Sequence, residues 1–212
     1  MKEPFGTLPS GETATLYTLS VGRLTAAVTD YGATLVRLLV PDANGNIADV
    51  VLGYNDCNGY RTANGACLGA TVGRNANRLK NASFTLNGQN YLLQANDGPN
   101  SLHSGPDCFH LRLWKTICYS DTSVTFELTS PDGDQGFPGN AVIRVAYELD
   151  TIGGLHIIYD AVSDRDTVFN LTNHSYFNLA GHEEADQAMN QILTIPGRFF
   201  CPDDAENIPT GE

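Results

Sequence analysis

The chain has 212 residues and a formal net charge of −12, from 24 acidic and 12 basic side chains. Apolar residues make up 42% of the chain and charged residues 17%, which predicts a folded, soluble protein rather than a disordered one. The excess of negative charge repels nucleic-acid phosphates and anionic lipids, so we expect neither as a partner. A small neutral ligand fits this charge better.

Targeting and redox signals favour the cytoplasm. The first twelve residues, MKEPFGTLPSGE, lack the apolar core of a secretory signal. The longest apolar stretches, such as VVLGY at 50–54, are far too short to cross a membrane. The five cysteines are odd in number and have no CxxC spacing, which favours free thiols in a reducing compartment.

Turn signals and alternation predict short antiparallel strands along the chain. Asn44-Gly45, Asn87-Gly88 and Gly153-Gly154 each separate two strand-like runs and predict type I′ hairpin turns. In 124–130 and 142–149 every second residue is a large apolar one, which is the pattern of a half-buried strand.

Helical periodicity is weak throughout. No run of a dozen residues shows it, and HEEADQAMN at 182–190 predicts at most one or two helical turns. With no linker or short repeat, the chain is predicted to be one all-β domain over residues 1–212, a sandwich or a barrel.

The stretch TVFNLTNHSYFNL at 167–179 is the most unusual of the predicted strands. One face combines amide, hydroxyl, imidazole and phenol groups: Asn170, Thr172, His174, Tyr176 and Asn178. The other face is mainly apolar and predicts core packing for Phe169, Leu171, Phe177 and Leu179. A cleft that binds a hydroxylated ligand uses such a polar row, although an exposed strand face with one histidine is the alternative.

Two further segments are candidates for the same site. TVGRNANRLK at 71–80 is too polar for a core strand, and GPNSLHSGPDCFH at 98–110 is a loop carrying His103 and His110; an ordinary polar loop is the alternative for both. The spacing of His103, Cys108 and His110 matches no established zinc pattern. Nucleophile-elbow and phosphate-loop motifs are absent from the sequence, and no metal site is predicted.

Five segments occur in the order and rough spacing of the aldose 1-epimerases, or galactose mutarotases. They are GRNANR at 73–78, NSLHSG at 100–105, DQGFPGN at 134–140, NLTNHSYFNLAG at 170–181 and IPTGE at 208–212. The chain resembles this family over essentially its whole length. Asn75 and Ser104 depart from it, since the family more often has a small apolar residue and a glycine there. The resemblance implies a large antiparallel β-sandwich with a sugar-binding cleft.

The resemblance also implies a reaction, the interconversion of the α and β anomers of a free aldose such as galactose or glucose. His174 corresponds to the general acid, and a histidine of ordinary pKa about 6.5 suits proton transfer near neutral pH. The resemblance also implies a role for His103, which we expect to be a supporting donor. The implied sugar-binding residues are Asn77, Arg78, His103, His174, Ser175 and Tyr176. Ring opening needs no cofactor, and we expect a free sugar as partner and a monomer or homodimer.

The family's general base, a glutamate, and another sugar contact, an aspartate, lie beyond the IPTGE segment. This chain ends at Glu212 within that segment, so we expect its C-terminal part to be missing and do not assign Glu212 as the base. Two alternatives to the epimerase stay open. One is a non-catalytic carbohydrate-binding module, and the other is a hexose-phosphate 1-epimerase, for which Arg74 and Arg78 are the nearby basic candidates.

Overall fold

The computed structural model describes residues 1–211, and Glu212 lies outside the described residues. The strands are β1 (Lys2–Thr7), β2 (Thr13–Val21), β3 (Leu24–Thr29), β4 (Thr34–Pro41), β5 (Ile47–Asp49), β6 (Thr71–Val72), β7 (Arg78–Leu79), β8 (Ser83–Leu86), β9 (Gln89–Leu92), β10 (Ser101–Leu102), β11 (Lys115–Tyr119), β12 (Ser123–Ser130), β13 (Ala141–Leu149), β14 (Leu155–Ser163) and β15 (Thr172–Asn173). The helix α1 (Cys57–Thr62) is accompanied by 3-10 turns η1 (Asn64–Ala66), η2 (Lys80–Ala82), η3 (Phe109–Leu111), η4 (Asp134–Gly136) and η5 (Ala185–Asn190). Within residues 1–211, no helix has the length and apolar character needed to span a membrane. The η5 turn agrees with the one or two helical turns predicted for 182–190.

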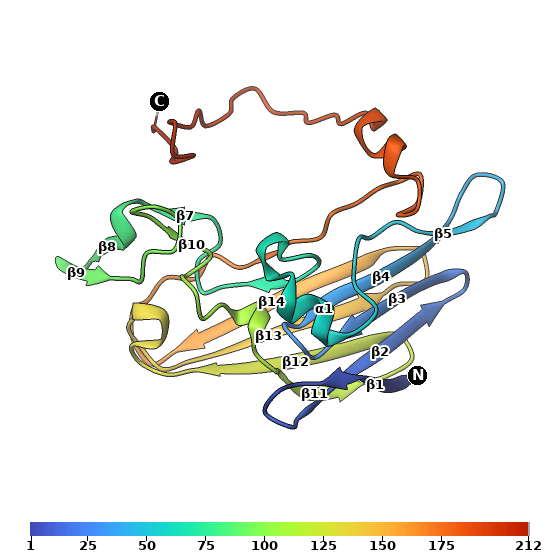
Figure 1. The fold of residues 1–212 in the computed structure, drawn as a ribbon, viewed down its shortest axis with the longest axis horizontal. Coiled ribbons are helices and arrows are strands. Elements are labelled where there is room, and N and C mark those ends of the chain that lie inside the picture. Colours follow the sequence, from blue (N-terminus) through green and yellow to red (C-terminus); the bar gives the residue numbers. More distant parts are fainter. Residues whose placement is uncertain (212) are drawn as a thin grey trace.

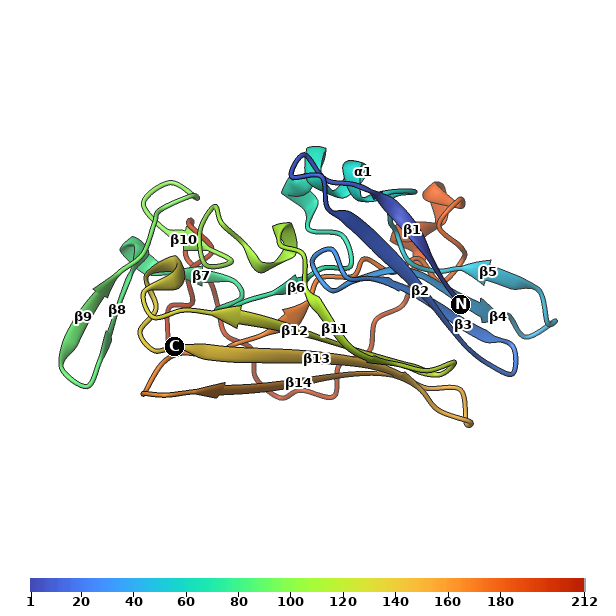
Figure 2. The ribbon, with the colours of Figure 1, turned by 90° about the horizontal axis from the view of Figure 1, so that it is seen from below.

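Two antiparallel sheets form the body of the molecule (Figure 1). One has the strand order β1-β2-β3-β4-β5 and the other the order β11-β12-β13-β14, so each strand pairs with its neighbour in sequence. Figure 2 shows the sheets as two layers whose strands cross obliquely. This arrangement confirms the predicted all-β antiparallel sandwich.

A single large core cluster lies between the two layers. Ile143, Val145 and Tyr147 of β13 are 0% exposed and belong to the same cluster as Leu19 and Val28 of the first sheet. Burial of each such side chain stabilises the fold by about 1.5–3 kcal/mol. The alternation predicted for the two runs in the second half of the chain is therefore confirmed.

The Asn87-Gly88 turn has the predicted form. The two residues have φ angles of 52° and 78° and directly join β8 to β9. This hairpin projects from one end of the molecule in both Figure 1 and Figure 2.

The other two predicted hairpins form, but their turns differ from the prediction. Only the second residue of Asn44-Gly45 and only the first of Gly153-Gly154 has a positive φ. In the first loop the Asp42 carboxylate accepts hydrogen bonds from two backbone N–H groups, and Asp150 does the same in the second. These longer loops are organised by an aspartate side chain, which a two-residue turn rule does not include.

Short strand pairs, rather than the large sheets, carry the predicted site segments. β6 pairs with β15, and β7 pairs with β10. The prediction of a strand over 167–179 is thus only partly right, because just two residues form β15. Isolated bridges from Asn170 to Asn75 and from Phe177 to Val51 hold the rest of the segment against the body.

The predicted faces of 167–179 hold for its first half only. Phe169 and Leu171 pack against the large core cluster, as predicted. Phe177 and Leu179 are 47% and 71% exposed, whereas Asn178 is only 2% exposed. The chain turns at Asn178, whose side chain hydrogen-bonds within the following residues, so the strand alternation ends there.

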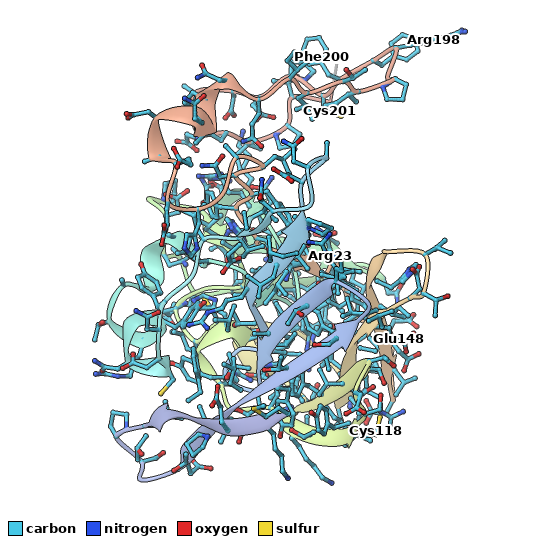
Figure 3. The ribbon with its side chains drawn as sticks, turned by 90° about the vertical axis from the view of Figure 1, so that its right-hand side faces the viewer. Arg23, Cys118, Glu148, Arg198, Phe200 and Cys201 are labelled. Carbon is cyan, nitrogen blue, oxygen red and sulfur yellow. The ribbon has the colours of Figure 1, made fainter. Side chains whose placement is uncertain are left out.

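Residues 192–200 form an arm that arches away from the two sheets (Figure 1). None of these residues hydrogen-bonds to another residue within 1–211. The large apolar side chains of the arm are at least 71% exposed: Ile192, Leu193, Ile195, Phe199 and Phe200. Figure 3 shows Arg198 and Phe200 well away from the body. The total exposed surface is 11703 Å², whereas a compact chain of this mass exposes roughly 9,600 Å².

We expect limited proteolysis with chymotrypsin to cleave first after Leu193, Phe199 or Phe200. An unpaired segment fits a protease active site without the local unfolding that a strand requires. Intact-mass spectrometry of early time points identifies the cut. The fully buried Phe109 and Phe126 serve as internal controls, and first cleavage at either would contradict the exposed arm.

Candidate active site

All six predicted site residues line one open cleft of about 770 Å³. Its lining comes mainly from residues 76–78, 102–103 and 170–176, which belong to the short strand pairs and their flanking loops. The predicted members of the lining are Asn77, Arg78, His103, His174, Ser175 and Tyr176. Three segments that are distant in sequence thus meet at one polar concavity of a size that suits a small molecule.

Backbone hydrogen bonds hold His103 beside Asn77. The His103 N–H donates to the Asn77 carbonyl at 3.0 Å, and the Asn77 N–H donates to His103 Nδ1 at 3.1 Å. Both residues have positive φ angles, 55° and 63°, in a region where Asn and His are found more often than most residues. Because Nδ1 accepts a hydrogen bond, the neutral imidazole carries its proton on Nε2.

His174 directly follows β15 and is held by its backbone. Its N–H donates to the Ala70 carbonyl at 2.9 Å, and its own carbonyl accepts from the Gly69 N–H at 3.1 Å. The preceding side chain, Asn173, donates to the Gly69 carbonyl at 2.8 Å and to Tyr147 Oη at 3.2 Å. Tyr147 is fully buried in the core, so the core itself fixes the position of His174.

The two histidine rings meet edge to face. Their centroids are 5.2 Å apart with an interplanar angle of 90°, and the Tyr176 ring lies 5.3 Å from His174 on another side. Burial, with smaller effects from His174 and Arg78, lowers the pKa of His103 to about 4. His103 is therefore uncharged at neutral pH and presents Nε2–H as a hydrogen-bond donor.

Arg78 is oriented by two side chains at the cleft. Its Nε donates to Asp97 Oδ2 at 2.7 Å, and one terminal nitrogen donates to Asn77 Oδ1 at 3.3 Å. Asp97 is not among the site residues predicted from the sequence. The Asp97-Gly98 pair just before the His103 loop resembles an ordinary turn, and only the folded structure brings it to Arg78.

Ser175 and Tyr176 contribute to the cleft in different ways. Tyr176 is 45% exposed and offers an accessible aromatic ring. Ser175 Oγ is buried and has no hydrogen-bond partner within residues 1–211. Ser175 thus lines the cleft while its hydroxyl oxygen is buried.

Two residues from the candidate segments lie outside the cleft lining. His110 is 7% exposed and has its Nε2 3.8 Å from Cys67 Sγ. Arg74 is 0% exposed, which contradicts the alternative of an ordinary polar loop for this part of 71–80. The same segment also contains the buried strand β6. Hydrogen bonds account for the buried Arg74 side chain, whereas His110 Nδ1 is buried without a hydrogen-bond partner among residues 1–211.

The sequence of the chain matches a known family. The model of that family, described as aldose 1-epimerase, matches residues 15–212. The chain belongs to the aldose 1-epimerase family. The family that the five segments predicted is therefore confirmed.

Curated aldose 1-epimerase relatives match nearly all of the chain. The galactose mutarotase of Bos taurus is 42% identical over 209 residues, which are 98% of this chain and 60% of the bovine protein. The aldose 1-epimerase of Escherichia coli (strain K12) is 37% identical over 202 residues, 95% of this chain and 58% of that protein. The chain thus spans about 60% of the length of these relatives.

Solved structures show the same fold. The GalM/aldose epimerase homologue from C. elegans matches with a TM-score of 0.83 and 33% identity, over 93% of this chain and 60% of that one. The galactose 1-epimerase from Lactobacillus acidophilus NCFM matches with a TM-score of 0.73 and 31% identity, over 84% and 53%. The sandwich is therefore of the galactose mutarotase type.

Proposed function

We propose that this chain carries an aldose 1-epimerase site, which interconverts the α and β anomers of free aldoses such as galactose and glucose. The observation that carries the proposal is the edge-to-face pair of His103 and His174 in the lining of the cleft. Family membership and the names of the relatives support it. The oxygen-rich ring of a sugar matches the amide, guanidinium and imidazole groups that line this cleft.

Anomer exchange requires two proton transfers around one bond. The bond between C1 and the ring oxygen breaks as the C1 hydroxyl loses its proton and the ring oxygen gains one, leaving an open-chain aldehyde. Rotation about C1–C2 and reversal of the same transfers close the ring as the other anomer. We assign delivery of the proton to the ring oxygen to His174, because a histidine both gives and takes protons near neutral pH.

His103 has a different role in this scheme. Its low pKa makes it a poor proton source at neutral pH. Its Nε2–H is nevertheless a hydrogen-bond donor, because the other ring nitrogen, Nδ1, accepts from the Asn77 N–H. Such a neutral donor stabilises the ring oxygen of the sugar as negative charge develops on it during ring opening. Asn77 and Arg78 supply further hydrogen bonds to sugar hydroxyls.

A hexose phosphate fits the cleft less well than a free sugar. Of the two arginines considered for phosphate binding, Arg74 is fully buried outside the cleft lining. Arg78 already forms an ion pair with Asp97 at 2.7 Å. The dianion would therefore meet one arginine whose charge is already balanced.

A non-catalytic sugar-binding module is the second candidate. Among the described residues that line the cleft, none is an aspartate or glutamate. The acceptor of the C1 hydroxyl proton is consequently not assigned to any of them. A cleft that binds sugar without such a carboxylate would hold both anomers and exchange them slowly.

Polarimetry distinguishes these functions. Freshly dissolved α-D-galactose is followed with and without the chain, and we expect mutarotation to accelerate in proportion to chain concentration. Isothermal titration with galactose provides the second readout. Binding without acceleration selects the binding module, and the absence of both contradicts a sugar site.

A further inference from the structure

Arg74 is a fully buried arginine whose guanidinium bonds only to neutral oxygens. It is 0% exposed. Its six oxygen acceptors are Ser130 Oγ (2.9 Å), Ser130 O (2.8 Å), Pro131 O (3.1 Å), Pro138 O (2.8 Å), Gly139 O (2.9 Å) and Thr167 Oγ1 (3.2 Å). Five of the six belong to the end of β12 and the loop from β12 to β13. The sixth lies at the start of the segment that leads to His174.

The nearby carboxylate of Asp134 is already held by another arginine. Arg112 donates to both Asp134 oxygens, at 2.7 and 2.8 Å, and Ser130 Oγ donates to one of them. Arg74 is therefore held by directional hydrogen bonds to neutral oxygens rather than by a direct ion pair. The planar guanidinium fixes the positions of the oxygens around it, and a flexible lysine ammonium does not reproduce this arrangement.

The backbone next to the Arg74 side chain is tied to the His174 segment. The Arg74 carbonyl accepts from the Asn170 N–H at 2.8 Å, and the Asn170 carbonyl accepts from the Ala76 N–H at 2.7 Å. Asn170 and Ala76 both line the cleft. The guanidinium and this backbone pair thus connect the same two segments, 73–78 and 167–174, at two separate points.

The other edge of residues 74–76 is tied to the His103 loop. Ser104 Oγ accepts from the Asn75 N–H at 2.8 Å and donates to the Asn75 carbonyl at 3.1 Å. Two residues further on, the Asn77 N–H donates to His103 Nδ1. A displacement of residues 74–76 would therefore reach His103 through both of these contacts.

We propose that Arg74 is a positioning residue for the two histidines. Its guanidinium holds segments 73–78 and 167–174 against the β12–β13 loop, which fixes the separation of His103 and His174 and keeps the His103 proton on Nε2. Arg74 touches neither the cleft nor a ligand, so its effect on sugar is indirect. The catalytic consequence rests on the proposed function, whereas the tautomer is a property of the unliganded chain.

The test is Arg74→Lys, which keeps the charge but has only three N–H donors for six oxygens. In wild type, long-range ¹H–¹⁵N spectra of the imidazoles at pH 7 should show His103 as the Nε2–H tautomer. In Arg74→Lys we expect a mixture of the two tautomers. We also expect kcat for mutarotation to fall by about 10-fold with KM within about 3-fold, because misplacement of reacting groups lowers the rate more than binding.

Arg112→Lys is the matched control, since Arg112 contacts the same loop through Asp134 and the end of the His103 loop through Asp107, but neither of the segments 73–78 and 167–174 that Arg74 joins. It should lose stability without changing the His103 spectrum. A folded Arg74→Lys with the wild-type spectrum overturns the proposal. If Arg74→Lys does not fold, Thr167→Val removes only the guanidinium contact to the His174 segment and leaves the backbone pair at Asn170. Wild-type imidazole spectra in that variant overturn the proposal. Wild-type chain without mutarotase activity would refute the proposed function, while the spectra would still decide the role of Arg74.

Discussion

Replacement of His174 by glutamine is expected to lower the rate constant of catalysed mutarotation by about 10²- to 10⁴-fold, the usual contribution of a general acid. Glutamine is close in size to histidine, but it does not exchange protons near neutral pH. The contacts that hold residue 174 in place are made by its backbone to Ala70 and Gly69, so they persist in the variant. Polarimetry gives the rate, and isothermal titration should show galactose affinity within about 10-fold of wild type.

His156→Gln is the control for this experiment. His156 lies on β14, has a side chain that is 54% exposed, and pairs with Asp150, and neither residue lines the cleft. The same substitution there should leave mutarotation unchanged. An equal loss of rate in both variants, or full activity of His174→Gln, would exclude His174 as the general acid.

The free energy of unfolding is expected to fall by about 2 kcal/mol between pH 6.5 and pH 4.5. Burial lowers the pKa of His103 and of His110 to about 4, whereas both histidines titrate near 6.5 in the unfolded chain. The unfolded state thus binds more protons in this window. The stabilisation from these two neutral histidines is complete above pH 6.5 and is lost as the pH falls toward 4.

Asp30 opposes this trend. Burial raises the pKa of its carboxyl to about 6, so the folded state keeps a proton there that the unfolded state has lost. Its stabilisation is present at low pH and disappears as the pH rises through 6. Two histidines against one aspartate leave a net uptake of about one proton on unfolding, or about 1.4 kcal/mol per pH unit in the middle of the window.

Urea unfolding at pH 6.5, 5.5 and 4.5 measures this slope. Asp30→Asn should roughly double it by removing the opposing group, and it preserves the Oδ1 that accepts from the Thr15 N–H. His110→Gln should reduce it toward zero. A stability that stays constant or increases as the pH falls in the wild-type chain would contradict burial of neutral histidines.

The long strands of the second sheet, their buried face and the family follow from local sequence. Alternation in β12 and β13 predicts which side chains are buried because a strand has a period of two and one face must leave water. The Asn87-Gly88 turn is likewise local, since two adjacent residues decide it. The segment around His174 identifies the family because its unusual succession of polar groups is itself written in adjacent residues.

The site geometry depends on contacts between distant residues, which no local pattern contains. Arg74 and Arg78 lie four residues apart in one polar segment, yet the fold buries the first among six oxygens and pairs the second with Asp97. The reversed exposure of Phe177 and Asn178 has a similar origin, because a turn interrupts the alternation there. Sequence alone thus determined the antiparallel β class, the family and the residue types of the cleft. Only the tertiary structure decided which polar side chains face it, because burial of each one depends on whether distant segments supply its hydrogen-bond partners.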